Sequence, residues 1–502
     1  MLKKKKKGKI MRLRSLDVVF LIFLLVFVFR LFFVLQTPNF SDNDAYYNLR
    51  QIAYIADNGR HLSYDELSYG GREIFGIPIF SYIMSVFYAL FGIYALKIIP
   101  AFFISMFVFA AYIIAKKFTE DNISANLAAL CSVFIPLFIF KTLNNISSYS
   151  LIFPLSFFFI YAFYRIEEKH YLILFILLSF LLPLMHPISF LLAISLIMYL
   201  ILGYVENIEI SGVKKEAVLF YIIVTFLFNF IIYKDAFTQI GLGVIWQNIP
   251  HIVLSEFFKD INILDLILNI GIVPLIAGII GVYFSLRNRN KDVLVLIAIC
   301  ITSILLVTLK LLNFSIGLIF LGIALSVISA VAFEKFLKYI DLTKLSKYLK
   351  AIKVSMLLFI VLTLVVPSML GTANVIDNTI KDEEIAPFLW MKENTALSAT
   401  ILTDLDEGNL ATGIAERKSV FDTNFLLVKN VDSVVEEASS LFTLESEVKA
   451  LELITKYDVD YIYLSEKTKK EYGIEMLKYG MDEKCFEKVF QNEYGEIIEI
   501  IC

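Results

Sequence analysis

Long runs of apolar residues, separated by short polar segments, make up most of the chain between residues 17 and 371. Many of these runs have about 17–24 residues with almost no charge, which is the length that an α-helix needs to cross a bilayer core of about 30 Å. Spans are predicted near 17–36, 95–115, 123–141, 150–166, 171–185, 187–205, 216–233, 264–286, 292–309, 313–336 and 353–371. The pattern predicts a polytopic α-helical membrane protein with about 11 spans.

A further apolar stretch, 76–94, is ambiguous, and the distribution of charge decides how it is interpreted. Cytoplasmic loops of membrane proteins are enriched in Lys and Arg. If 76–94 does not cross, almost all short basic loops share the cytoplasmic side, whereas a crossing would place the basic linker 334–350 outside. We therefore predict one long outer loop, 37–94, whose second half associates with the membrane. The odd number of spans then places the C-terminus outside the cytoplasm.

The first residues, 1–16, form a basic block that precedes the first span. A block of this kind acts as a topology anchor and stays in the cytoplasm. A cleaved signal peptide is the alternative, but no small-residue cleavage site follows the apolar run. The chain is thus expected to lie in the cell membrane with a cytoplasmic N-terminus.

Residues 372–502 differ from the rest of the chain, since they are polar and have about twice as many acidic as basic residues. Three short segments rich in β-branched and aromatic residues, "ATILTDL", "SVFDTNF" and "VDYIYLS", predict strands. "LESEVKALELITKY" predicts an amphipathic helix. The apolar content is too high for a disordered tail, so the pattern predicts a small extracytoplasmic α/β domain after the transmembrane domain 17–371.

Composition supports the membrane assignment and excludes a soluble protein of this size. Of the 502 residues, 58% are hydrophobic, and the mean hydropathy is +0.75, whereas soluble chains are about 45–50% apolar. The four cysteines form no CxxC motif or Cys/His cluster, which argues against a zinc or redox centre. A disulfide between Cys485 and Cys502 is possible if that region lies outside the cell.

The informative residues in such a chain are ionisable groups at the outer membrane face. Asp42 and Asp44 open the long outer loop, and "DAYYNLRQIAYIADNG" predicts a helix that begins near Asp44 and ends at Gly59. Asp44 is therefore either a helix cap or a catalytic carboxylate. Arg50, on the same helix, either pairs with a nearby acid or binds substrate.

Two further outer-loop residues have the same two interpretations. Glu256 lies in the otherwise apolar run "HIVLSEFFKD" and is either exposed on an interfacial helix or faces a cavity. Lys310, in "VTLKLLNFSIG", either extends along the apolar surface to the membrane interface or binds a phosphate.

These segments together resemble a known family. "NDAYYNLRQIAYIADNGRHLSYDELSYG" resembles the first outer loop of the archaeal-type catalytic subunit of oligosaccharyltransferase, a GT-C membrane glycosyltransferase with the motif N-D-P-Y-Y-H-L-R. "IVLSEFFKDINILDLILNIG" is similar to the family's outer-loop T-V-A-E or S-V-S-E motif. "WMKENTALSATILTDLDEGNLATGIAERKSVFD" resembles the segment that opens the family's soluble domain, W-x-x-E-N-T followed by W-W-D-Y-G.

The resemblance implies roles for individual residues. It makes Asp44 the residue that helps to bind a divalent metal, Mg²⁺ or Mn²⁺, and to orient the acceptor, and it leaves Asp42 without a role. It makes Glu256 the acceptor-contacting glutamate and places Asp406, in "DLDEG", in the motif that holds the acceptor. It also explains the stretch 76–94, because the family's first loop contains a membrane-associated segment.

Three departures from the family pattern qualify these roles. The second outer loop of the family carries an acidic pair, whereas the matching positions here are Asn145 and Ser147. Divalent cations of this kind prefer several oxygen ligands, carboxylates especially, so the loss of this pair predicts poor metal affinity. "DLDEG" lacks both Trp residues of its motif, and the arginine that clamps the donor phosphate is replaced by Lys310, which lacks the bidentate fork.

The sequence therefore predicts a membrane glycosyltransferase that transfers a sugar from a polyprenyl-phosphate-linked donor to a protein or lipid acceptor on the outer face. One alternative is a non-catalytic relative that binds a lipid-linked glycan or a partner enzyme. Another is a transporter or channel, but no Gly/Pro-broken helix pair occurs in two matching halves. Besides the lipid-linked sugar, the bilayer and the acceptor, no nucleic-acid partner is expected.

Overall fold

The computed structural model describes residues 2–246, 249–251, 253–254, 258, 262–481 and 484–502. The chain folds into two compact units. The first, which we call the membrane unit, comprises 1–36, 97–231 and 258–377. The second unit comprises 37–96, 232–257 and 378–502. Glu256 lies outside the described residues.

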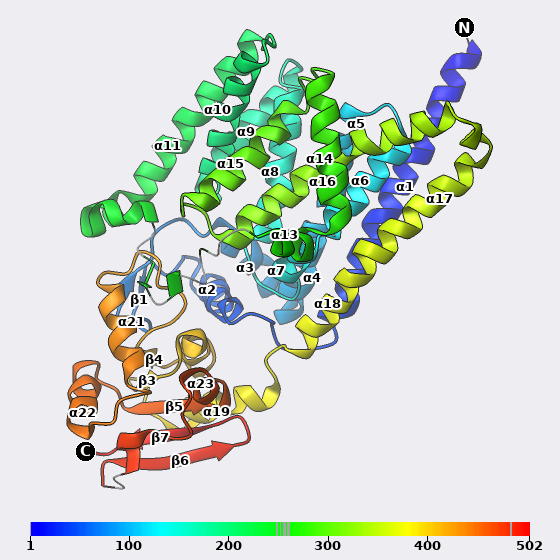
Figure 1. The fold of residues 1–502 in the computed structure, drawn as a ribbon. Coiled ribbons are helices and arrows are strands. Elements are labelled where there is room, and N and C mark those ends of the chain that lie inside the picture. Colours follow the sequence, from blue (N-terminus) through cyan, green and yellow to red (C-terminus); the bar gives the residue numbers. More distant parts are fainter. Residues whose placement is uncertain (1, 247–248, 252, 255–257, 259–261, 482–483) are drawn as a thin grey trace. The chain divides into compact units, whose positions relative to one another are not determined.

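The membrane unit is built from helices (Figure 1). In chain order these are α1 (Leu2–Val34), α4 (Ile93–Ser105), α5 (Phe107–Phe118), α6 (Asn122–Val133), α7 (Pro136–Thr142), α8 (Tyr149–Tyr164), α9 (Lys169–Met185), α10 (Ser189–Val205), α11 (Gly212–Ile240), α13 (Ile263–Ile270), α14 (Ile272–Arg287), α15 (Leu294–Thr308), α16 (Phe314–Asp341), α17 (Leu349–Ile360) and α18 (Val366–Asp377). Helices α4 and α11 begin or end in the second unit.

Every span predicted from the sequence falls on one of these helices, on a bent pair of them, or on consecutive helices, as for 95–115 on α4 and α5 and for 353–371 on α17 and α18. Among the described residues, five helices are long and apolar enough to cross a membrane, or up to seven if each bent pair counts as one span. The bends are 50° between α6 and α7 and 105° between α13 and α14. Other predicted spans are apolar helices of 10–17 residues. The chain is thus a multi-pass membrane protein, and the number of 11 spans stays a prediction.

Helix α16 lies at the centre of the membrane unit, and its 18-residue apolar window is fully buried. It packs closely on α14 because two glycines of α14 leave room for its backbone. A Cβ atom on Gly278 would lie 2.8 Å from the Leu325 carbonyl oxygen, and one on Gly281 would lie 2.6 Å from that of Ile328. Small residues at such crossings let membrane helices approach closely.

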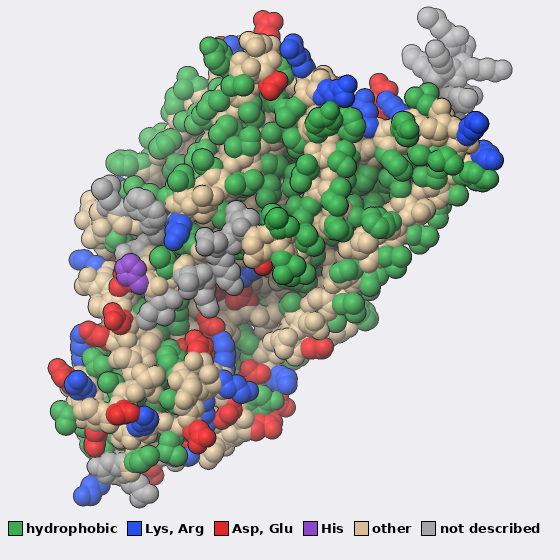
Figure 2. Space-filling view, in the orientation of Figure 1, with side chains coloured by type: hydrophobic (Ala, Val, Ile, Leu, Met, Phe, Trp, Pro, Cys, Tyr) green, Lys and Arg blue, Asp and Glu red, His purple; other side chains and the backbone are tan. Residues whose placement is uncertain are grey.

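The distribution of apolar and charged side chains over the surface is that expected of a protein in a bilayer. Hydrophobic side chains cover the surface of the membrane-unit helices, and charged side chains gather at the helix ends and over the second unit (Figure 2). Exposed apolar residues such as Phe20, Leu177 and Ile279 need no protein partner when lipid surrounds them.

The second unit contains both helices and strands. Its first part consists of α2 (Asp44–Asn58), a short antiparallel pair formed by β1 (Tyr64–Asp65) and β2 (Arg72–Glu73), and the apolar helix α3 (Ile79–Phe91). Helix α3 lies in the stretch predicted to associate with the membrane, and with 13 residues it is shorter than a typical span.

The C-terminal part of the second unit is a five-stranded sheet with the order β4-β3-β5-β7-β6. Its strands are β3 (Thr400–Leu402), β4 (Lys418–Ser419), β5 (Tyr461–Ser465), β6 (Phe486–Asn492) and β7 (Gly495–Ile500), and its helices include α19 (Asp382–Asn394), α20 (Gly408–Leu410), α21 (Val431–Ser440), α22 (Glu447–Lys456) and α23 (Glu466–Tyr472). Strand β3 pairs parallel with β4 and β5, and β7 pairs antiparallel with β5 and β6.

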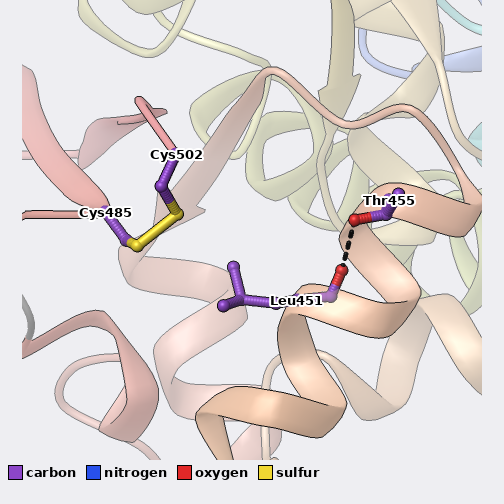
Figure 3. The surroundings of a disulfide bond; sticks show 4 residues. All are labelled: Leu451, Thr455, Cys485 and Cys502. Atoms are coloured by element: carbon purple, nitrogen blue, oxygen red, sulfur yellow. Dashed lines mark hydrogen bonds between the residues drawn. A yellow bond between two sulfur atoms is a disulfide. The ribbon is translucent and has the colours of Figure 1, made fainter.

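Strands β3 and β5 and helix α22 lie within the segments predicted for them. The strand predicted over "SVFDTNF" is wrong for most of its length, because β4 ends at Ser419 and the rest of that segment is a loop. The β6–β7 hairpin was not predicted. A disulfide joins Cys485, just before β6, to Cys502, just after β7 (Figure 3). This disulfide closes the open end of the β6–β7 hairpin. The other two cysteines, Cys131 and Cys300, are buried free thiols in the membrane unit.

Candidate active site

Asp44 is the first residue of α2, at an exposed end of that helix. The Asp42 carboxylate accepts the Asp44 backbone N–H at 3.1 Å, so Asp42 satisfies one of the free amides at the helix start. The helix ends at Gly59, which adopts a left-handed φ of 69°, as predicted. Asp44 therefore lies in the first turn, where a carboxylate is favoured by the helix dipole, while the N-cap position belongs to Asn43.

Two side chains from the C-terminal part of the second unit hold the Asp44 carboxylate. The Asn409 side-chain amide donates to Asp44 Oδ1 at 3.2 Å, and the Thr423 hydroxyl donates to the same oxygen. The Asn409 amide also donates to Thr423 Oγ1 at 2.7 Å. We call Asn409 and Thr423 the clamp. It joins the start of α2 to two segments more than 360 residues later in the chain.

A second layer of polar groups fixes the clamp itself. The Asn424 amide donates to Asn409 Oδ1 at 2.6 Å. The fully buried Asp422 carboxylate accepts the Asn424 backbone N–H at 2.8 Å and the Ser68 hydroxyl at 2.7 Å. Hydrogen bonds to charged groups are roughly twice as strong as those between neutral groups, so the loop that carries Thr423 has a defined position.

Gly408 explains why the two segments of the clamp can lie so close together. A Cβ atom at this position would lie 2.2 Å from the Phe421 carbonyl oxygen and 2.6 Å from Asp422 Cβ. Any other residue would separate "EGNL" from "FDTN". The glycine of "DLDEG" therefore has a steric role in placing Asn409 next to Thr423.

Arg50 lies beneath this site and faces inward. Its guanidinium forms an ion pair with Asp65, and the two side chains are 13% and 1% exposed. Arg50 and Arg72 lie 5.9 and 5.7 Å from the centre of the Tyr47 ring, and Arg72 donates to the Asn424 carbonyl oxygen. These contacts connect Arg50 to the support of the clamp.

Asp406 contacts the start of α2 through its backbone carbonyl group. Its carbonyl oxygen accepts the Asn43 side-chain amide, and its exposed carboxylate pairs with Lys467. The neighbouring Glu407 is buried and accepts the Thr468 hydroxyl at 3.3 Å. Burial raises the pKa of Glu407 to about 8. The structure thus brings the residues of "DLDEG" close to the start of α2.

The remaining candidates lie in the membrane unit. Lys310 is exposed just after α15 and adopts a left-handed φ of 56°. Asn145 and Ser147 lie between α7 and α8. Two buried cations adjoin this segment: Lys97 donates to Asn144 Oδ1 at 3.1 Å, and Arg30 donates to the Thr142 carbonyl oxygen at 3.3 Å.

Three of these residues were not predicted from the sequence. Asn409 lies in the segment that resembles the start of the family's soluble domain, and Thr423 lies in "SVFDTNF". The residue that both contact, Asp44, is more than 360 positions earlier in the chain. The available signal was the polar run "DTN" inside the predicted strand "SVFDTNF"; in the structure β4 ends at Ser419 and this run belongs to the loop that follows it, a common place for functional residues. Lys97 stands at the start of the predicted span 95–115, where an ionisable residue is costly and often functional.

The described side chains do not fit a divalent metal centre at Asp44. They contain no group of three or more His, Cys, Asp or Glu residues that could hold a metal ion. The Asp44 oxygen Oδ1 is engaged by an amide and a hydroxyl, both neutral donors. Mg²⁺ and Mn²⁺ prefer several oxygen ligands, carboxylates especially, and the described residues around Asp44 do not supply them.

Comparison with known proteins gives a result for the fold alone. No protein-family profile matches the chain, and no curated protein matches it in sequence. Among solved structures, it is similar to archaeal oligosaccharyltransferase AglB from Archaeoglobus fulgidus, in complex with an inhibitory peptide and a dolichol-phosphate. The TM-score is 0.66 at 15% identity, over 91% of this chain and 70% of that one.

A second enzyme matches over almost the whole length of both chains. It is ArnT from Cupriavidus metallidurans bound to undecaprenyl phosphate, with a TM-score of 0.57 at 11% identity over 98% of each chain. Both neighbours are GT-C glycosyltransferases. The family resemblance predicted from the sequence is confirmed at the level of the fold: this chain has the GT-C fold of archaeal oligosaccharyltransferase and ArnT.

Proposed function

We propose that this protein is a membrane glycosyltransferase that transfers a sugar from a polyprenyl-phosphate-linked donor to an acceptor on the outer face of the membrane. The observation that carries the proposal is the exposed Asp44 carboxylate, with Oδ1 held by Asn409 and Thr423. Catalysis benefits when a reacting group is held in one geometry before the substrate binds.

Asp44 acts as the general base in this proposal. An acceptor hydroxyl or amine whose oxygen or nitrogen lies about 3 Å from a carboxylate oxygen transfers its proton to Asp44. The acceptor atom then forms a bond to the anomeric carbon of the sugar. The bond between that carbon and the phosphate oxygen breaks, and the polyprenyl phosphate leaves with the bonding electron pair.

The donor is a polyprenyl monophosphate in this proposal. The solved neighbours are bound to dolichol-phosphate and undecaprenyl phosphate, both monophosphates. A monophosphate needs less charge neutralisation than a pyrophosphate, and the membrane unit offers Lys97, Arg30 and Lys310 as cations. Lys97 and Arg30 supply positive charge next to the segment of Asn145 and Ser147, where the resemblance leads one to expect acids and a metal.

The acceptor is not the Asn-x-Ser/Thr sequence of oligosaccharyltransferases in this proposal. "DLDEG" lacks the two Trp residues of the family motif, and the Asp406 carboxylate pairs with Lys467. Glu256 remains a proposed acceptor-contacting residue, and Asp406 a proposed binding residue through its backbone beside Asn43.

The second unit lies outside the cytoplasm in this proposal. Its disulfide supports this orientation, because such bonds persist in oxidising compartments. The distribution of Lys and Arg along the chain favours the same orientation.

A non-catalytic relative that binds lipid-linked glycan is the second candidate. The observations that favour it are the absence of acids at Asn145 and Ser147 and the engagement of Asp406 by Lys467. Such a protein would not need a clamped and exposed carboxylate, which is why we prefer the enzyme.

Analysis of surface glycans and glycolipids in a deletion strain distinguishes the two candidates. The strain is complemented with the wild type, with Asp44→Asn, or with Asp42→Asn as the matched control, which keeps an acceptor for the Asp44 amide. We expect a missing sugar that the wild type and Asp42→Asn restore and Asp44→Asn does not. Full restoration by Asp44→Asn would favour the non-catalytic protein.

A further inference from the structure

Helices α14, α16 and α17 of the membrane unit, labelled in Figure 1, line an apolar groove of about 800 Å³. Its walls include Ile276 and Ile280 of α14, Phe336 of α16 and Phe359 of α17, all of them at least 43% exposed. Its volume falls in the range of about 300–1,000 Å³ that is usual for ligand sites.

The groove exists because α17 packs loosely against its neighbours. Ile360 is the only residue of α17 that is buried, whereas α14 and α16 are locked together through Gly278 and Gly281. The α14 wall extends from Ile272 to Phe284, which is about 18 Å at 1.5 Å per residue. One leaflet of a bilayer core is about 15 Å thick, so the groove has the length of one lipid chain.

One end of the groove is basic. Lys335 lines it beside Tyr339, and Lys335 forms no ion pair among the described residues. Residues 335–353, which continue from α16 into α17, contain six lysines and one acidic residue. A basic site between membrane helices at the cytoplasmic side is suited to an anionic lipid headgroup.

This end lies away from the proposed donor-phosphate cations. Lys97 and Lys116 occupy opposite ends of one span, Ile93–Phe118, about 28 Å apart along a helix. Lys116 interacts electrostatically with Glu334, the neighbour of Lys335. The basic end of the groove therefore belongs to the membrane face opposite to Lys97.

We infer that the groove binds an anionic phospholipid of the cytoplasmic leaflet. One acyl chain fills the space between α14, α16 and α17, and the phosphate of the headgroup contacts the Lys335 ammonium. The phospholipid fills the space between α17 and its neighbours and so fixes that helix. This site is separate from the one proposed for the donor, so it can be correct even if the glycosyltransferase proposal fails.

Native mass spectrometry of the full-length protein in mild detergent tests the inference. The protein is titrated with palmitoyl-oleoyl phosphatidylglycerol or with phosphatidylcholine of the same chains. We expect one phosphatidylglycerol to bind at least about fivefold more tightly than phosphatidylcholine, because one lysine near an anionic headgroup contributes roughly that factor.

Variants identify the site. Lys335→Gln should weaken phosphatidylglycerol binding about fivefold and phosphatidylcholine binding less, because the choline group already neutralises the phosphate of that lipid. Its matched control is Lys347→Gln, which removes an exposed lysine of the same basic segment that does not line the groove. Ala277→Phe, which fills the groove, should weaken both lipids, with size-exclusion chromatography as the check on folding.

Three results would overturn the inference. The first is equal binding of the two lipids, and the second is wild-type binding by Lys335→Gln. The third is a Lys335-dependent site that takes undecaprenyl phosphate in preference to phosphatidylglycerol, since that would assign the groove to the donor lipid. Because Lys335 is exposed, its replacement leaves the helix packing unchanged and keeps the test valid.

Discussion

The clamp gives a quantitative prediction for the variant Asn409→Asp. The two side chains have the same shape, so the substitution adds a carboxylate 3.2 Å from Asp44 Oδ1 without changing the packing. The new group can still accept the Asn424 amide, but it can no longer donate to Asp44 or to Thr423. Two carboxylates that share a site resist ionising together.

The size of the effect follows from the distance. Two like charges 3.2 Å apart repel by about 1.3 kcal/mol in water and by about 5 kcal/mol at an effective dielectric constant of about 20. These energies correspond to about 1 and about 4 pH units in the second ionisation of the pair. Asp44 is exposed whereas Asn409 is fully buried, so we expect a value between these two limits.

The assay is the pH dependence of kcat/KM for sugar transfer. If Asp44 is the general base, activity falls at low pH as the carboxylate is protonated. In Asn409→Asp the acidic limb should move to higher pH by about 1 unit or more, with activity recovering as the pH rises. The control is Asn394→Asp, which adds a carboxylate at an exposed position whose amide donates to the Trp390 carbonyl oxygen. A folded Asn409→Asp protein with an unmoved acidic limb would refute this account of the site.

Four further predictions concern other parts of the molecule. Burial raises the pKa of Glu407 to about 8 from 4.5, so between these values the folded state keeps the carboxyl proton that the unfolded state has lost. The melting temperature of the wild type should therefore fall as pH rises from about 5 to 8. The melting temperature of Glu407→Gln should not show this fall. Reduction of the bond between Cys485 and Cys502, or Cys485→Ser, should lower the free energy of unfolding, measured with denaturant, by about 3 kcal/mol for a loop of this length. Reduced thiols at these two positions in protein purified from cells would contradict the extracytoplasmic orientation. Arg50→Ala should lower the free energy of unfolding by about 3–5 kcal/mol, because it leaves Asp65 buried without its ion-pair partner, and the yield of folded protein should fall. A raised KM with unchanged stability would instead support direct substrate binding by Arg50. Addition of a chelator should leave transfer activity unchanged, because the described residues do not form a divalent metal site. Loss of activity that Mg²⁺ or Mn²⁺ restores would show that other residues complete such a site.

The sequence predicted the helices of the membrane unit well, because the apolar runs carry the information locally. Each predicted span falls on a helix, a bent pair or consecutive helices, although the bends at α6–α7 and α13–α14 could not be predicted from hydropathy. The position of Asp44 at the start of a helix that ends at Gly59 was also local information, since the left-handed Gly59 and the preceding periodicity mark that end.

The environment of Asp44 could not be predicted from the same information. Its clamp depends on contacts with Asn409 and Thr423, which are separated from it by more than 360 residues. Arg50 had two interpretations in the sequence, and the structure shows the ion pair with Asp65. The β6–β7 hairpin was missed because β6 has mixed polar and apolar residues and is only partly buried, so it lacks a clear two-residue alternation.

The central claim is that the clamped Asp44 carboxylate performs sugar transfer from a lipid-linked donor. Its most direct test is the transfer of labelled sugar from a polyprenyl-phosphate donor by protein reconstituted in liposomes, using the acceptor fraction identified from the deletion strain. The account predicts turnover by the wild type and by Asp42→Asn, and a loss of at least about 100-fold in Asp44→Asn. Turnover by Asp44→Asn at the wild-type rate would contradict it.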